Sequence, residues 1–113
     1  MARAGERLAA VGGAVEAEAR RRGFRVLRDL CGHGIGRKIH ERPSVLNYFN
    51  PRDRTRLNTG LVIALEPIIS AGSGRSRPER DGWTVSSADG SLTAHYEHTI
   101  VITDDQPLVL TAA

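Results

Sequence analysis

The sequence predicts a small α+β domain, in which an N-terminal helix is followed by several short strands. Apolar residues near the N-terminus recur at the spacing of one helix face. Apolar runs with strand character follow at residues 61–65 and 94–102, and turns rich in Gly, Pro, Asn and Asp separate them. A chain of 113 residues is long enough for one domain at most, so we expect residues 1–113 to form a single domain.

The helix is predicted over residues 4–22, and Gly23 ends it in a C-terminal capping position. Gly12 and Gly13 each weaken its middle by about 1 kcal/mol. The helix therefore depends on packing against an apolar surface. The side chains expected to face that surface are Leu8, Val11, Val15 and Ala19.

The strands are predicted from short apolar runs. Residues 38–60 are polar and interrupted by prolines, which favours a surface loop with turns over a long element. The buried strand at residues 61–65 ends near Pro67, and a turn at Asp89-Gly90 separates two later strands. The predicted strands are residues 24–27, 61–65, 82–85, 94–102 and 108–110.

Composition and charge exclude several classes of protein. Residues 1–28 carry seven Arg and three Glu, a net charge of +4, compared with +3 for the whole chain. No aromatic residues interleave with Arg20, Arg21 and Arg22 to stack on bases. Nucleic-acid binding is therefore disfavoured against a solvated helix end. A lone cysteine, Cys31, forms no internal disulfide, and no apolar stretch reaches the roughly 20 residues that cross a bilayer. We expect a cytoplasmic protein without a membrane segment.

Three residues offer an imidazole and two carboxylates to a divalent metal. Glu66 and Glu97 lie inside the apolar runs at residues 61–69 and 94–102, where an unpaired carboxylate is costly to desolvate. His33 lies among glycines that let the backbone approach closely, so we expect its ring to emerge from a tight turn into a crowded site. An ordinary turn histidine is an alternative explanation of His33, as is a solvent-facing strand position of Glu97.

Two other motifs fail on spacing. The glycines around His33 match neither the Walker pattern nor the dinucleotide fingerprint. His40-Glu41 begins like a zincin helix, but Ser44 stands at the place of its second histidine and Pro43 would break the helix. His40 is instead a candidate for a hydrogen bond to substrate or to a developing oxyanion, although a solvated loop histidine is as good an explanation.

Five motifs taken in order closely resemble the type I methionine aminopeptidases. The resemblance covers nearly every residue from about position 4. The motifs are Cys31-Gly32-His33-Gly34-Ile35-Gly36-Arg37, His40-Glu41-x-Pro43, Leu65-Glu66-Pro67, Asp81-Gly82-Trp83-Thr84 and Tyr96-Glu97-His98-Thr99-Ile100-Val101.

The resemblance implies the C-terminal half of a pita-bread fold, with one N-terminal helix packed on a curved, mainly antiparallel sheet. The family removes N-terminal methionine from nascent peptides by metal-activated water. By motif, the implied metal ligands are His33, Glu66 and Glu97, and Glu97 would bridge two ions. Glu66 would also accept a proton from the attacking water, and His40 would steady the tetrahedral intermediate. Ile39, Trp83 and Cys31 are implied to lie near the pocket for the methionine side chain.

The family takes two aspartate ligands and another substrate-contacting histidine from its first half, and no motif here reproduces them. Two carboxylates neutralise one divalent ion, so we predict one ion per chain rather than two, with Co, Mn, Fe or Zn as the metal. We expect activity to need a partner, either a complementary N-terminal half or a second copy in a homodimer. The alternative is a non-catalytic, truncated pita-bread module for partner binding.

Overall fold

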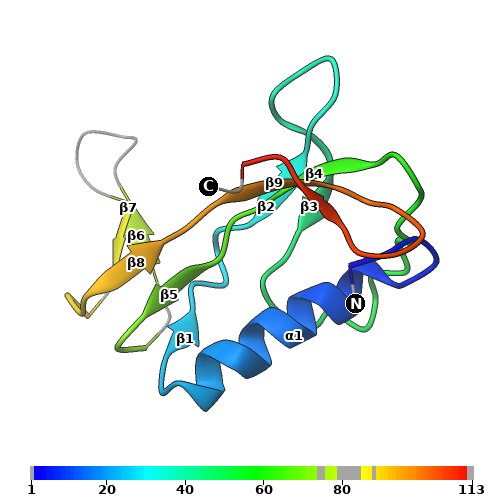
Figure 1. The fold of residues 1–113 in the computed structure, drawn as a ribbon. Helices are drawn as coiled ribbons and strands as arrows, with labels where there is room; N and C mark the ends of the chain where they lie inside the picture. The colour runs from blue at the N-terminus through cyan, green and yellow to red at the C-terminus, as the bar shows by residue number, and fades with distance from the viewer. Residues whose placement is uncertain (1, 74–75, 79–84, 88, 112–113) are drawn as a thin grey trace.

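The computed structural model describes residues 2–73, 76–78, 85–87 and 89–111, and Figure 1 shows their course. One helix, α1 (Leu8–Arg21), precedes a series of short strands. The strands are β1 (Arg25–Val26), β2 (Gly32–Gly34), β3 (Glu41–Val45), β4 (Val62–Leu65), β5 (Ile68–Ser70), β6 (Ser76–Pro78), β7 (Val85–Ser87), β8 (Thr93–His95), β9 (His98–Val101) and β10 (Leu108–Val109).

Helix α1 is shorter than predicted at its N-terminal end. Backbone hydrogen bonds tie Ala4 to the carbonyl of Thr103 and Leu8 to that of Thr55, so residues 4–7 are held by distant segments and cannot join the helix. The C-terminal end agrees with the prediction, because Gly23 follows the helix with φ 83°, which a side chain would disfavour. Gly12 is buried against the backbone carbonyls of Leu46 and Tyr48, so its missing side chain permits the packing that the helix needs.

The larger sheet has five strands in the order β10-β9-β4-β2-β3, and every pairing is antiparallel. Helix α1 lies along one face of it (Figure 1). The residues that fill the space between them form one buried cluster: Leu8, Val11, Val45, Leu57, Ile63, Ile100 and Ile102.

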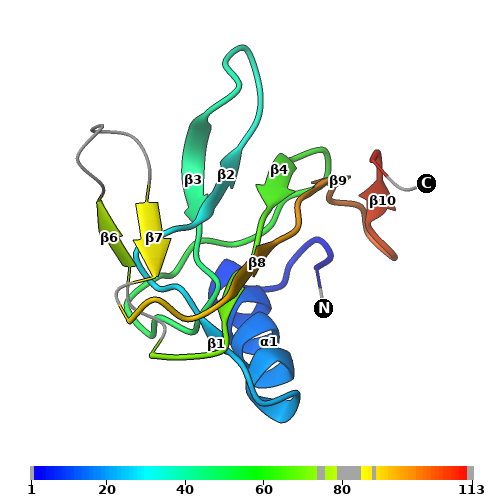
Figure 2. The same cartoon turned by 90° about the vertical axis from the view of Figure 1, so that its left-hand side faces the viewer.

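The smaller sheet has three strands in the order β1-β5-β8, again antiparallel. It continues the larger sheet, because β4 leads directly into β5 and β8 leads directly into β9 (Figure 1). A two-stranded ribbon of β6 and β7 and the β2–β3 hairpin both project away from α1 (Figure 2).

The structure corrects two of the predicted elements. Residues 41–45 are a strand rather than part of a surface loop, and Val45 at its end is fully buried opposite Gly32. Pro43 is tolerated because β3 is an edge strand of the sheet. The run at residues 94–102 is two strands, interrupted at Tyr96 and Glu97. Of the strand predicted at residues 82–85, residues 82–84 lie outside the described residues.

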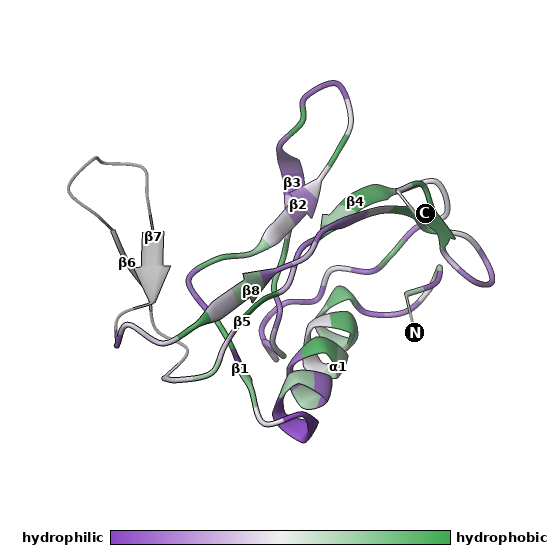
Figure 3. Ribbon diagram, turned by 60° about the vertical axis from the view of Figure 1, so that its left-hand side comes forward, coloured by the Kyte–Doolittle hydropathy of each residue, from purple (hydrophilic) through white to green (hydrophobic). Residues whose placement is uncertain are grey.

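Hydropathy follows this architecture. The last turn of α1, which carries Arg20 and Arg21, is the hydrophilic end of an otherwise largely apolar helix (Figure 3). In the part of the chain that the structure describes, no helix is both long and apolar enough to cross a bilayer.

Candidate metal centre

Two strand breaks, at residues 66–67 and 96–97, fall at one place in the molecule, the junction between the two sheets. The last described pair of the larger sheet is Leu65 with His98, and the first pair of the smaller sheet is Ile68 with His95. Pro67 lacks the N–H that a ladder requires, and its carbonyl accepts a hydrogen bond of 3.3 Å from the Tyr96 N–H. The two strands thus stay side by side through the junction although the regular ladder is broken.

The register places the two glutamates opposite one another. Paired residue numbers add to 163 on both sides of the junction, as in 65 and 98 or 68 and 95. Continuing that register pairs Glu66 with Glu97, since 66 and 97 also add to 163. Like charges directly opposite on neighbouring strands destabilise a sheet, so this arrangement calls for a cation.

His33 reaches the same site from the neighbouring strand β2. It pairs with Ala64, which in turn pairs with Thr99. Because side chains alternate along a strand, Glu66 and Glu97, each two residues from these positions, lie on the same face as His33. One ligand atom from each of His33, Glu66 and Glu97 lies within 4.8 Å of the others.

The glycines on either side of His33 let β2 fit between its neighbours. A Cβ on Gly32 would collide with the carbonyl oxygen of Ala64, and one on Gly34 with that of Arg42. His33 is therefore in a strand, and the prediction that it emerges from a tight turn is wrong. The close approach that the glycines were expected to permit is observed, but between strands.

The His33 ring is oriented by its own backbone. Its Nδ1 lies 3.0 Å from the carbonyl oxygen of Gly34, an acceptor, so Nδ1 carries the proton in this hydrogen bond. Its Nε2 then faces Glu66 Oε1 at 3.1 Å. Nε2 and the carboxylate oxygen each have a lone pair to offer, and a cation between them would accept both. A backbone carbonyl on the second ring nitrogen is the usual support of a metal-binding histidine.

The two glutamates differ in exposure. Glu66 is largely buried, with 16% of its side chain exposed, whereas Glu97 is exposed. The expectation that both carboxylates are desolvated therefore holds for Glu66 only. The strand break at Tyr96 and Glu97 brings the second carboxylate to the surface of the site.

The other predicted site residues are more dispersed. The His40 ring, which is exposed, lies beside that of His33, with 4.2 Å between the ring centroids. Cys31 and Ile39 are exposed, and 71% of Ile39 is accessible to solvent. Trp83 lies outside the described residues.

Two further residues contact Glu66 and were not among the predicted site residues. His95 Nε2 lies 3.3 Å from Glu66 Oε2, and Asn47 Nδ2 donates a 3.3 Å hydrogen bond to the Glu66 backbone carbonyl. Asn47 is fully buried, and its Oδ1 has no partner among the described residues. The two-residue spacing of His95 from Glu97 could have indicated the first, because such residues share a strand face. The spacing of Asn47 from Val45 could have indicated the second.

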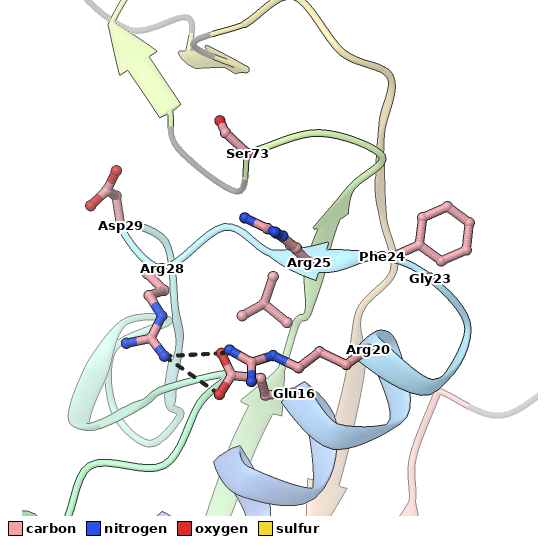
Figure 4. A pocket seen from close by; sticks show the side chains of 9 residues that line it. Glu16, Arg20, Gly23, Phe24, Arg25, Arg28, Asp29 and Ser73 are labelled. Carbon is pink, nitrogen blue, oxygen red and sulfur yellow. Dashed lines mark hydrogen bonds and ion pairs between the residues drawn. The ribbon is translucent and has the colours of Figure 1, made fainter.

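A large cavity elsewhere shares no residue with this cluster. It has a volume of about 760 Å³ and lies between the end of α1, β1 and the segment after it (Figure 4). Glu16, on α1, forms an ion pair of 3.0 Å with Arg28 and a longer one of 3.8 Å with Arg20. Its carboxylate therefore offsets part of the positive charge around this cavity, which contains neither the imidazole nor the carboxylates of the candidate metal centre.

One imidazole and two carboxylates on an open sheet face are a donor set typical of divalent-metal hydrolases. The chain belongs to metallopeptidase family M24, whose model matches residues 1–104. It is similar to methionine aminopeptidase 2 of Bacillus subtilis, with 49% identity over 97% of this chain, and to the methionine aminopeptidase of Salmonella typhimurium, with 45% identity over 98%.

Solved structures agree with the fold. The methionine aminopeptidase of Thermotoga maritima matches all of this chain with a TM-score of 0.93 and 41% identity, and that of Rickettsia prowazekii matches 98% with a TM-score of 0.91 and 39% identity. An X-Pro aminopeptidase of Thermotoga maritima, at 22% identity and a TM-score of 0.66, shares the fold. The half pita-bread architecture predicted from the sequence is confirmed. The chain spans 45% and 42% of the length of the two bacterial relatives above.

Proposed function

We propose that this chain is the C-terminal half of a methionine aminopeptidase and supplies one divalent-metal site to the removal of N-terminal methionine. The observation that carries the proposal is the convergence of His33, Glu66 and Glu97, whose ligand atoms lie within 4.8 Å of one another. Their charges support one ion, since two carboxylates neutralise a single dication. Co, Mn, Fe and Zn all accept this mixed ligand set.

The reaction is hydrolysis of the first peptide bond. A bound metal would supply a water of lowered pKa, near 7 in well-studied sites. In the proposed step, the water oxygen bonds to the carbonyl carbon, the C–N bond breaks and a proton passes to the leaving amine. Glu66 takes the proton from the water and returns it. His40, beside His33, donates to the oxygen of the tetrahedral intermediate.

Substrate recognition is assigned by family motif. Cys31, Ile39 and Trp83 would contribute to the pocket for the methionine side chain of a nascent peptide. The exposed position of Ile39 suits a residue that is covered only when substrate or a second half is present. The compartment we propose is the cytoplasm, where nascent chains are made.

Exposed apolar side chains support a need for a partner. Large apolar side chains are exposed at several points of the described residues, as expected where another part of a larger fold packs. We propose that a complementary N-terminal half, or a second copy, covers them. They include Ile39, Phe49, Leu92, Tyr96, Leu108 and Leu110.

The experiment is cleavage of a Met-Ala-Ser peptide by the purified chain with added Co or Mn, first alone and then with a separately supplied first half from a relative. We expect little turnover alone and a clear gain with the added half. The matched control is the added half without this chain. Metal binding without cleavage under either condition would contradict the peptidase proposal and favour a non-catalytic, partner-binding module.

A further inference from the structure

We propose that His95 is a positioning residue for Glu66, holding the carboxylate oxygen that faces away from His33. The inference rests on the proposed metal site and assigns a residue to it that the motifs did not. Its basis is a pair of contacts on opposite oxygens of a single carboxylate. His33 Nε2 lies 3.1 Å from Oε1, and His95 Nε2 lies 3.3 Å from Oε2.

The sheet geometry explains how His95 reaches Glu66. Glu66 is opposite Glu97 in the register, and His95 is two residues before Glu97 on the same strand face. His95 is therefore a diagonal cross-strand neighbour of Glu66, at a separation that long side chains span. Its direct partner across the strands is Ile68, which offers no competing polar group.

The need for such a residue follows from the flexibility of a glutamate. The terminal torsion of a glutamate side chain has a broad, roughly two-fold preference, so neither oxygen is selected by the chain itself. The Glu66 backbone is restricted by the proline that follows it and held by the hydrogen bond that its carbonyl accepts from Asn47. With the Nε2–H of His95 donating to Oε2, the carboxylate plane is fixed as well, and Oε1 is directed at the candidate metal centre.

His95 differs from the proposed ligands in place and exposure. It lies outside the group of side chains whose ligand atoms approach within 4.8 Å, and its side chain is 48% exposed, against 14% for His33. It contacts the carboxylate from the solvent side. Partners of this kind orient metal ligands, and their loss typically reduces metal affinity about 10- to 100-fold.

The first test compares Co(II) affinity and the visible absorption of bound Co(II) in His95→Leu, His95→Gln and wild type. The inference predicts that His95→Leu weakens binding about 10- to 100-fold. Glutamine keeps an N–H donor, so His95→Gln should retain affinity within about threefold, with an unchanged Co(II) band because the ligand set is unchanged. His98→Gln is the matched control, since the His98 ring contacts Tyr96 and Thr111 instead of Glu66.

Wild-type affinity in His95→Leu would overturn the inference. A shifted Co(II) band together with equal losses in both His95 variants would also overturn it, because His95 would then be a ligand itself.

A second readout needs no metal and separates this inference from the proposed function. In chelator, ¹⁵N spectra of the histidine rings should show a proton on His95 Nε2, and Glu66→Ala should shift that signal while leaving His98 unchanged. An unaltered His95 signal in Glu66→Ala would reject the positioning role whether or not the wild-type chain binds metal. If wild type binds no metal and the shift is still seen, the metal proposal fails and the contact between His95 and Glu66 stands.

Discussion

The two sheets of this molecule are joined where β4 leads into β5 and β8 leads into β9, yet they differ in how well they are packed. The five-stranded sheet packs on α1 and contributes fully buried residues such as Val45 and Ile63. In the three-stranded sheet, Val26 and Ser70 are buried, but every residue of the edge strand β8 is exposed. Glu66 and Glu97 lie where one sheet passes into the other. The comparison teaches that the candidate metal centre is bordered by a well-packed sheet on one side and by an exposed edge strand, β8, on the other.

The sharpest way to break this contrast is to shorten one isoleucine in each sheet. Ile63→Ala removes a fully buried side chain between the larger sheet and α1 and should cost about 2–5 kcal/mol of unfolding free energy. Ile69→Ala, at a half-buried position of β5, should cost about half of that or less. Urea unfolding followed by circular dichroism measures both. Equal costs would show that the smaller sheet is as firmly packed as the larger one.

The next largest effect is expected at the strand that carries His33. Gly32→Ala places a methyl group against the Ala64 carbonyl, so β2 must move away from β4. We expect a loss of about 1–3 kcal/mol in stability and a fall of at least about tenfold in Co(II) affinity. Gly36→Ala is the matched control, because its methyl group meets only the flexible end of the Glu41 side chain. Similar losses of stability and Co(II) affinity in the two variants would show that the spacing between β2 and β4 does not determine metal binding.

A smaller effect, of opposite sign, is expected at the junction itself. In chelator, Glu97→Gln removes one of two like charges on opposed strands, so the metal-free chain should gain about 0.2–1 kcal/mol. The gain should shrink at high salt, because Glu97 is exposed. Unfolding midpoints at low and high salt measure it. A loss of stability in this variant would mean that the two carboxylates do not repel each other in the folded chain.

The smallest effect is expected far from the junction, at the end of α1. Hydrogen bonds from Arg21 and then Arg22 lower the pKa of Glu18 from 4.5 to about 2. A lowered folded-state pKa stabilises the fold above the ordinary pKa, and this contribution is lost as the pH falls from about 4.5 to about 2. Glu18 is fully solvated, so the change should be slight.

Urea midpoints across this pH range, compared with Glu18→Gln, test the expectation. Superimposable pH profiles for the two proteins would contradict it.

The sequence was sufficient for the helix, the strand at β4 and the identity of the three converging side chains. The helix end at Gly23 and the strand end at Pro67 follow from local backbone chemistry, and local patterns report such features well. The strand character of β2 and β3 was missed because it arises from pairing: Gly32 and Pro43 are poor strand formers, and distant partners hold them in place.

The contacts of His95 and Asn47 with Glu66 were missed for a related reason. Both contacts depend on strand register and on side-chain direction. His95 lies 29 residues after Glu66 in the sequence, and Asn47 lies 19 residues before it. A single sequence without a register does not specify such contacts. The exposure of Glu97 likewise depends on a strand break that the apolar run at residues 94–102 conceals.

Calorimetric titration of the chelator-treated chain with Co(II) tests most directly whether the sheet junction is a metal centre. The wild-type chain should bind one ion, Glu97→Ala should lose this binding, and Glu6→Ala, a glutamate distant from the junction in the N-terminal segment, should behave as wild type. An isotherm that is the same for Glu97→Ala and wild type would show that the opposed carboxylates do not hold a metal.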